Sequence, residues 1–128
     1  MPMVYLTLLI AAVLPIIIAA STHIFKIKQF GKIDNNHPRI QLAKLEGIGA
    51  RAYAAQLNAW EALAMFTAAV FVAYAMAVDM NSLALPASVF LIARLLHPVA
   101  YLMNLGFIRS AIWAVGFFAT VYIAYLAF

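Results

Sequence analysis

Seven polar residues interrupt the apolar stretches of this chain, and their types suit the binding of a small charged molecule. In chain order they are Arg51, Asn58, Glu61, Arg94, His97, Tyr101 and Arg109. Three arginines against one carboxylate leave a surplus of positive charge. Guanidinium groups bind carboxylates and other oxyanions through paired, charge-assisted hydrogen bonds. The set therefore predicts a site for a small anionic ligand.

The composition shows which solvent surrounds these residues. Of the 128 residues 68% are hydrophobic and only 9% are charged, and the mean hydropathy is +1.01. A soluble domain of this size has no interior large enough for so much apolar surface, so we expect lipid to solvate most of the chain. The chain has no cysteine, which excludes disulfides, a cysteine nucleophile and cysteine metal ligands. Any thiol chemistry must use a thiol that a substrate supplies.

The net charge of +4 does not indicate a nucleic-acid partner. Most basic residues lie between the first two apolar stretches, where positive charge usually sets membrane topology. They are Lys26, Lys28, Lys32, Arg39, Lys44 and Arg51.

Four apolar stretches predict four membrane-spanning helices. The apolar stretches cover about 4–25, 59–78, 83–105 and 111–128. With the polar entrance of the second and the arginine that opens the fourth, the predicted spans are 4–25, 50–78, 83–105 and 108–128. Each is close to the ~20 residues that cross ~30 Å of hydrocarbon as a helix. The first has no basic residue before it and is longer than a usual signal-peptide core, so we interpret it as a span. The prediction is one all-α domain over residues 1–128, an integral membrane four-helix bundle with up-down topology. The basic loop 26–49 is expected in the cytoplasm and both termini on the opposite side.

The polar residues form one stripe on each of the two middle spans. Glu61 lies ten residues after Arg51, and Arg94 lies ten residues before Asn104, so both are expected roughly 15 Å inside the membrane. An isolated charge there costs at least ~2.5 to 3.5 kcal/mol on insertion scales. We therefore expect Glu61 and Arg94 to neutralise each other or a bound polar ligand. The alternative is a structural polar core, in which these residues only hold the helices together.

Two other functions fit the residues less well. His23 and His97 could form a pair of haem ligands, but no supporting motif accompanies them. A small four-span multidrug exporter fits the length but requires an acidic residue in the first span, which has none.

At the two stripes the sequence resembles the MAPEG family, the membrane-associated proteins of eicosanoid and glutathione metabolism. RAYAAQLNAWEALAMF resembles the second-helix signature of the family, an arginine followed by N-x-x-E. ARLLHPVAYLMN resembles its third-helix R-x-x-H-x-x-x-Y pattern, and FIRSAIWAVGFF carries an arginine that opens the fourth helix. The resemblance covers nearly the whole chain. The histidine at position 97 is typical of the microsomal glutathione transferase and prostaglandin E synthase branch, and the chain resembles a bacterial-type member.

The resemblance implies a homotrimer in the bacterial inner membrane, with glutathione bound between subunits near the cytoplasmic side. It implies that glutathione is the co-substrate, that no metal is needed and that a lipophilic small molecule is the second substrate. Arg109 matches the arginine that stabilises the thiolate, and we expect Tyr101 to assist it. The positions implied to bind glutathione are Arg51, Asn58, Glu61, Arg94 and His97. The implied activity is transfer of glutathione to a lipophilic electrophile, or reduction of a hydroperoxide.

Two positions depart from the family pattern. Family enzymes commonly have an arginine that binds a glutathione carboxylate where this chain has Ala54, and Ala62 replaces a tyrosine of the leukotriene synthase branch. Loss of one charge-assisted hydrogen bond lowers affinity by roughly 10- to 150-fold, unless Lys26, Lys28 or Arg39 takes the place of the missing arginine. A second hypothesis is therefore a non-enzymatic or differently liganded membrane protein of the same fold, with a structural polar core.

Overall fold

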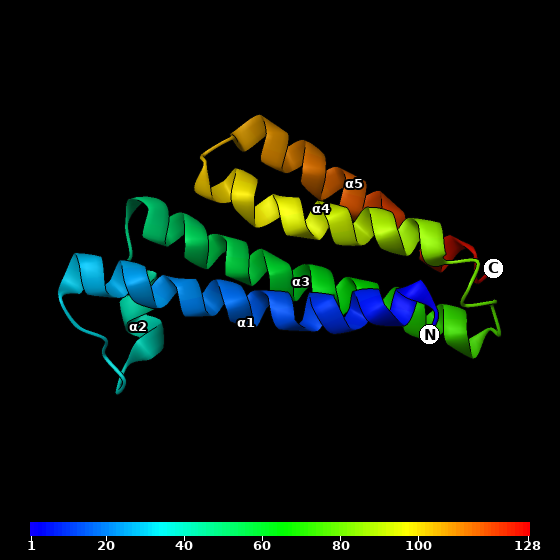
Figure 1. The fold of residues 1–128 in the computed structure, drawn as a ribbon, viewed down its shortest axis with the longest axis horizontal. Helices are drawn as coiled ribbons and strands as arrows, with labels where there is room; N and C mark the ends of the chain where they lie inside the picture. Colours follow the sequence, from blue (N-terminus) through cyan, green and yellow to red (C-terminus); the bar gives the residue numbers. More distant parts are fainter.

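The chain folds into five helices and no strand in a computed structural model that describes residues 1–128 (Figure 1). The helices are α1 (Met3–Phe30), α2 (Pro38–Ala43), α3 (Gly47–Ala75), α4 (Ala84–Leu102) and α5 (Gly106–Tyr125). All but α2 are long and apolar enough to cross a membrane. The predicted fold class, an all-α membrane bundle of four long helices, is confirmed.

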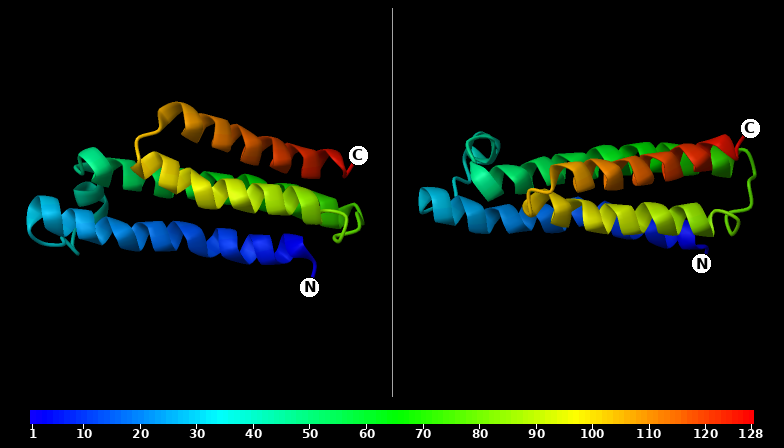
Figure 2. Two further views of the ribbon diagram at one scale, coloured as in Figure 1. Left: turned by 45° about the horizontal axis from the view of Figure 1, so that its top comes forward. Right: turned by 90° about the horizontal axis from the view of Figure 1, so that it is seen from above.

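The four long helices run alternately in opposite directions and form two neighbouring pairs (Figures 1 and 2). Helix α1 packs along α3, and α4 packs along α5. Further contacts join α1 to α4 and α3 to both α4 and α5, so the two pairs make one bundle. Both termini lie at the same end of the bundle (Figure 1).

The two pairs differ in length. Helices α1 and α3 have 28 and 29 residues, whereas α4 and α5 have 19 and 20. At 1.5 Å per residue the first pair is longer by roughly 13 Å. Figure 2 shows α1 and α3 continuing beyond α4 and α5 at the end that carries α2. Helix α1 thus runs five residues past the end of its expected span, to Phe30. The next residue, Gly31, has the left-handed conformation (φ 75°), in which glycine commonly ends helices.

Two prolines lie inside membrane helices. Pro15 is in α1 and Pro98 is in α4, and each removes one backbone N–H from its helix. Neighbouring helices make such gaps tolerable in lipid, because freed carbonyls lie against protein rather than hydrocarbon. The freed carbonyls belong to Ala11 and Arg94, four residues before each proline, and both residues are buried.

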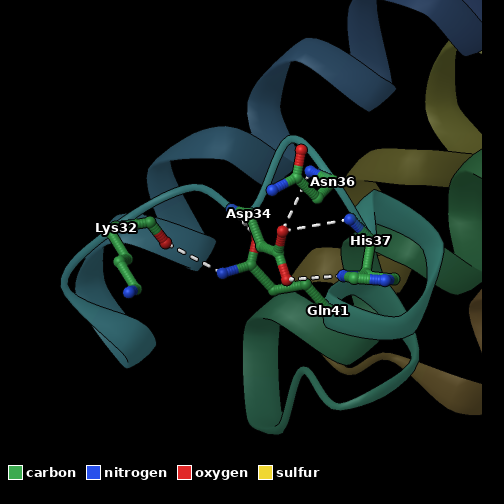
Figure 3. A network of polar contacts seen from close by, with 5 residues as sticks. All are labelled: Lys32, Asp34, Asn36, His37 and Gln41. Carbon is green, nitrogen blue, oxygen red and sulfur yellow. Dashed lines mark hydrogen bonds and ion pairs between the residues drawn. The ribbon is translucent and has the colours of Figure 1, made fainter.

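The segment between α1 and α3 is folded rather than a simple polar loop. The Gln41 side chain of α2 donates to the Lys32 carbonyl at 2.8 Å and accepts the Asp34 N–H at 3.0 Å (Figure 3). The Asp34 carboxylate accepts the N–H groups of Asn36 at 2.9 Å and His37 at 3.0 Å. The bond from the His37 N–H, more than any other contact, holds the pKa of Asp34 below its ordinary value.

Most of the apolar core lies at the end of the bundle with the termini. A cluster of 13 buried residues includes Phe66 and Phe90, whose rings stack with centroids 3.9 Å apart. At the other end the buried apolar cluster has only three members, Ile18, Ala55 and Ala59. The predicted polar site lies toward this second end, where apolar packing is sparse.

Candidate functional site

A hydrogen bond between α3 and α4 forms the centre of the polar region. Arg94 is only 4% exposed, and its Nη1 donates to Oδ1 of Asn58 at 3.0 Å. The same amide donates through Nδ2 to Oε2 of Glu61 at 3.5 Å. The Asn58 side chain therefore links the buried guanidinium to the carboxylate across two helices.

The expected ion pair between Glu61 and Arg94 is not formed. The Asn58 amide lies between Arg94 and Glu61. The contact between acidic and basic side chains in this chain is that of Asp34 with the His37 ring, at 3.7 Å. The count from helix ends placed Glu61 level with Arg94, yet α3 begins at Gly47 and α4 ends at Leu102. The reference ends are therefore not level, and Asn58 rather than Glu61 faces Arg94.

A second group of polar side chains joins α4 to α5. The Arg109 guanidinium carbon lies 4.5 Å from the centroid of the Tyr101 ring, within cation–π range. The Tyr101 ring in turn meets the His97 ring edge-on, with centroids 5.6 Å apart. His97 is 4% exposed, and Tyr101 also packs against the small apolar cluster of Ile18, Ala55 and Ala59. Two residues from the sequence prediction, Tyr101 and Arg109, thus lie in direct contact.

Arg51 completes the stripe of α3 but makes no side-chain hydrogen bond. Its Nε atom is buried and has no acceptor. On the same helix, the Gln56 Oε1 atom is also buried and accepts no hydrogen bond. The sequence analysis did not single out Gln56, although a glutamine in an apolar span costs free energy unless it is paired and is itself a signal.

Gly116 and Thr120 on α5 are two residues that the sequence analysis missed. A Cβ atom at Gly116 would lie 3.2 Å from both Nε and Nη2 of Arg94. Gly116 is buried, and its carbonyl accepts the Thr120 hydroxyl at 3.0 Å. The signal was present, since small residues in membrane helices commonly mark close approach of a neighbouring helix.

His23, the other histidine in a membrane helix, makes different contacts from His97. His23 is exposed, and its Nδ1 lies 3.3 Å and 3.2 Å from the carbonyls of Ala19 and Ala20 in its own helix. His97 makes its ring contact with Tyr101 instead. No group of three or more His, Cys, Asp or Glu side chains gathers in the structure.

The arrangement brings cations and hydrogen-bonding groups together without a protein nucleophile. Arg94 lies on α4, and Arg109 of α5 lies against Tyr101 of α4. Glu61 is exposed and neutralises neither arginine. Such a site can bind and orient an anion and stabilise negative charge that develops on it.

Comparison with known proteins supports the motif assignment. The model of the MAPEG family matches residues 3–128, which is nearly the whole chain. Comparison with curated proteins and with solved structures gave no match. With four helices able to cross a bilayer and a match of this extent, the chain is an integral membrane protein that belongs to the MAPEG family.

Proposed function

We propose that this protein is a membrane-embedded, glutathione-dependent transferase or peroxidase that activates the thiol of glutathione. The observation that carries the proposal is the set of polar contacts that runs from Arg109 through Tyr101 and His97 on one side, and from Arg94 through Asn58 on the other. Membership of the MAPEG family supports a glutathione-related activity.

Arg109 and Tyr101 are assigned to the sulfur. A free thiol has a pKa near 8.5, and the thiolate is the nucleophile. The Arg109 guanidinium lies at the start of α5, 4.5 Å from the Tyr101 ring, where its positive charge favours the anionic form of a nearby sulfur. The tyrosine hydroxyl can donate a hydrogen bond to the same anion.

The other five residues are assigned to the rest of glutathione. Glutathione carries two carboxylates and one amine. Arg51 suits a carboxylate and Glu61 suits the amine, while the buried Arg94 orients this part of the site through Asn58. His97 and Asn58 supply further hydrogen bonds. The protein then acts by positioning and charge stabilisation rather than by forming a covalent bond to the substrate.

The exposure of Glu61 supports a homotrimer with the site between subunits. Glu61 lies in a helix able to span the membrane, and its side chain is exposed in the single chain. An acidic residue in contact with lipid is costly, and a neighbouring copy that covers it removes this cost. A lipophilic electrophile or hydroperoxide then reaches the site laterally from the bilayer.

The proposed location is the bacterial inner membrane, with the segment 26–49 in the cytoplasm and both termini on the opposite side. The basic residues at the end of the bundle that carries α2 support this orientation, because positively charged loops stay on the cytoplasmic side. Lys28, Lys32, Arg39 and Lys44 are all exposed there.

The test is a titration of detergent-solubilised protein with glutathione, followed by the ultraviolet absorbance of the thiolate. Wild type is expected to give a saturable signal that Arg109→Ala abolishes while the oligomer stays intact. Lys44→Ala is the matched control, because it removes one positive charge from the exposed segment between α1 and α3. No signal at millimolar glutathione, or a full signal in Arg109→Ala, contradicts the proposal.

A structural polar core is the second candidate, and two observations favour it. Ala54 stands where the family commonly has a glutathione-binding arginine. In addition, the Arg94–Asn58 hydrogen bond joins two helices directly through protein side chains. In this reading the protein keeps the fold and the polar contacts but has no thiol activation.

A further inference from the structure

The Arg94 guanidinium uses only part of its hydrogen-bonding capacity on Asn58. Its Nη1 donates to the Asn58 amide, whereas Nε and Nη2 are buried and have no partner within the protein. A buried guanidinium with unmet N–H groups is strongly disfavoured in a low-dielectric interior. Within the single chain, these two groups therefore require a partner that is not a side chain.

A small cavity among α3, α4 and α5 adjoins these N–H groups. Its volume is about 10 Å³, and its lining includes Arg94, Gly116 and Thr120. The rest of the lining, including Phe90 and Phe117, is largely apolar. A Cβ at Gly116 would lie 3.2 Å from both Nε and Nη2, so a larger residue here would crowd this side of the guanidinium.

We propose that this cavity binds one ordered water molecule that holds Arg94 in place. The volume fits one water, since about 10 to 15 Å³ measured in this way is what a single molecule needs. The water accepts hydrogen bonds from Nε–H and Nη2–H, which point in the same direction on a guanidinium. It donates to Oγ1 of Thr120, which makes three bonds, the typical number for a buried water.

The Thr120 hydroxyl favours water over a small anion such as chloride. Its proton is donated to the Gly116 carbonyl at 3.0 Å, so its oxygen offers only lone pairs to the cavity. Water can donate to those lone pairs, whereas an anion would be repelled by them. An anion would have the two Arg94 N–H groups as its partners, and the largely apolar remainder of the wall would leave it poorly solvated.

Gly116 is accordingly a positioning residue for Arg94, because it leaves room for the water that holds the guanidinium. With one side of the guanidinium held by water, Nη1 faces Asn58 and, through it, Glu61. The inference concerns the protein without a ligand and does not depend on glutathione being the substrate.

The first experiment is an experimental structure of the purified protein at a resolution that shows ordered water. The expected result is one density peak about 3 Å from both Nε and Nη2 of Arg94, at the position the Gly116 side leaves open. An empty cavity, in a map that shows other buried waters, overturns the proposal. So does an anomalous signal at this position from protein prepared in bromide, which identifies an anion.

A set of variants tests the same site by thermal unfolding in detergent. Gly116→Ala is expected to lower the unfolding midpoint by roughly 2 to 8 °C, because it closes the cavity and displaces Arg94. Gly106→Ala is the matched control on the same helix, since nothing lies within 4 Å of a Cβ there. Thr120→Val should lower the midpoint and Thr120→Ser should not, because serine keeps the oxygen that accepts from the water.

The role of Arg94 is separated from general packing by a double variant. In an Arg94→Met background, Gly116→Ala and Thr120→Val should each lose most of their effect, because the charged groups that need the water are gone. Equal effects of these changes with and without Arg94 overturn the proposal. The glutathione titration enters none of these measurements, so failure of the proposed enzymatic activity leaves their outcome unchanged.

Discussion

Nη1 of Arg94 on α4 lies 3.0 Å from Oδ1 of Asn58 on α3. This hydrogen bond joins the side chains of two helices at the centre of the polar region. Asn58 has no charge of its own, yet its amide presents an oxygen to the guanidinium and an N–H to Glu61 at 3.5 Å. Two charges of opposite sign are thereby linked through a neutral group, and the carboxylate stays exposed.

Asn58→Ala tests what this link contributes to folding. The change leaves the Arg94 Nη1 group without its partner in the interior, so we expect a loss of about 1 to 3 kcal/mol in the free energy of unfolding. Denaturation in detergent measures it. Thr67→Ala is the control, because Thr67 is an exposed polar residue of the same helix. Equal stability of the two variants would show that the hydrogen bond contributes nothing.

Substitutions at Tyr101 separate the ring from the hydroxyl. Tyr101→Phe keeps the face on which Arg109 rests, and Tyr101→Ala removes it, at a cost of about 0.5 to 2 kcal/mol for the cation–π contact in addition to lost packing. We expect the phenylalanine variant to unfold like wild type but to show a weaker thiolate signal with glutathione. The alanine variant should lose both stability and signal. A full signal in Tyr101→Phe would remove the hydroxyl from the proposed mechanism.

Ala54→Arg tests the missing carboxylate ligand on α3. One added charge-assisted hydrogen bond should raise glutathione affinity by roughly 10- to 150-fold. Calorimetric or spectroscopic titration measures the change, and Ala43→Arg in the exposed part of α2 controls for added charge alone. A steep gain from an undetectable baseline would favour the structural polar core in the natural protein. No gain would mean that glutathione does not approach this face of α3.

The oligomeric state is tested by native mass spectrometry from mild detergent. We expect a complex of three times the 14.0 kDa chain, the trimer that the family resemblance implies. A neighbouring copy that covers Glu61 would also remove the cost of an acid facing lipid. A persistent monomer across several detergents would contradict a site shared between subunits.

The folded segment between α1 and α3 should respond to acid through Asp34. Because folding lowers the pKa of this carboxyl below its ordinary value of 3.8, its stabilisation is fully present above that value. It is lost as the pH falls through the lowered pKa. Asp34→Ala should remove it at neutral pH as well.

Hydrogen exchange at the backbone amides of Asn36 and His37 reports on this segment, because both amides donate to the Asp34 carboxylate. Faster exchange of these two amides is expected in Asp34→Ala near pH 7, relative to their intrinsic rates. Asn35→Ala, a change at the exposed neighbouring position, should leave them protected. Protection that is unchanged in Asp34→Ala would show that other bonds hold the segment.

Apolar runs of about 20 residues were sufficient to predict the four long helices, because lipid leaves the backbone few alternatives. They could not predict that α1 continues to Phe30 or that α2 forms at Pro38–Ala43. Beyond the hydrocarbon a helix needs no apolar residues, and its end depends on local features such as Gly31. The short α2 depends on contacts of Gln41 with residues up to nine positions away.

The site residues were recognisable by type, but their partners depended on the relative height of the helices. A displacement of about one turn decides whether Arg94 meets Asn58 or Glu61, and no periodicity within a single helix contains that information. Gly116 was harder to recognise. Its importance comes from Arg94, which lies opposite on another helix, whereas a glycine in isolation indicates only that some neighbour approaches closely.

The uneven distribution of the apolar core separates folding from chemistry along the length of the bundle. The 13-residue cluster near the termini anchors one end, while the end with the polar site has a buried apolar cluster of three. Regions with few buried apolar contacts open at lower free energy than the rest of a protein. Substitutions among the polar residues should therefore cause local opening of one end rather than loss of the whole fold. A bundle built in this way can accept new residues in its site, and so a new ligand, while the opposite end keeps it folded.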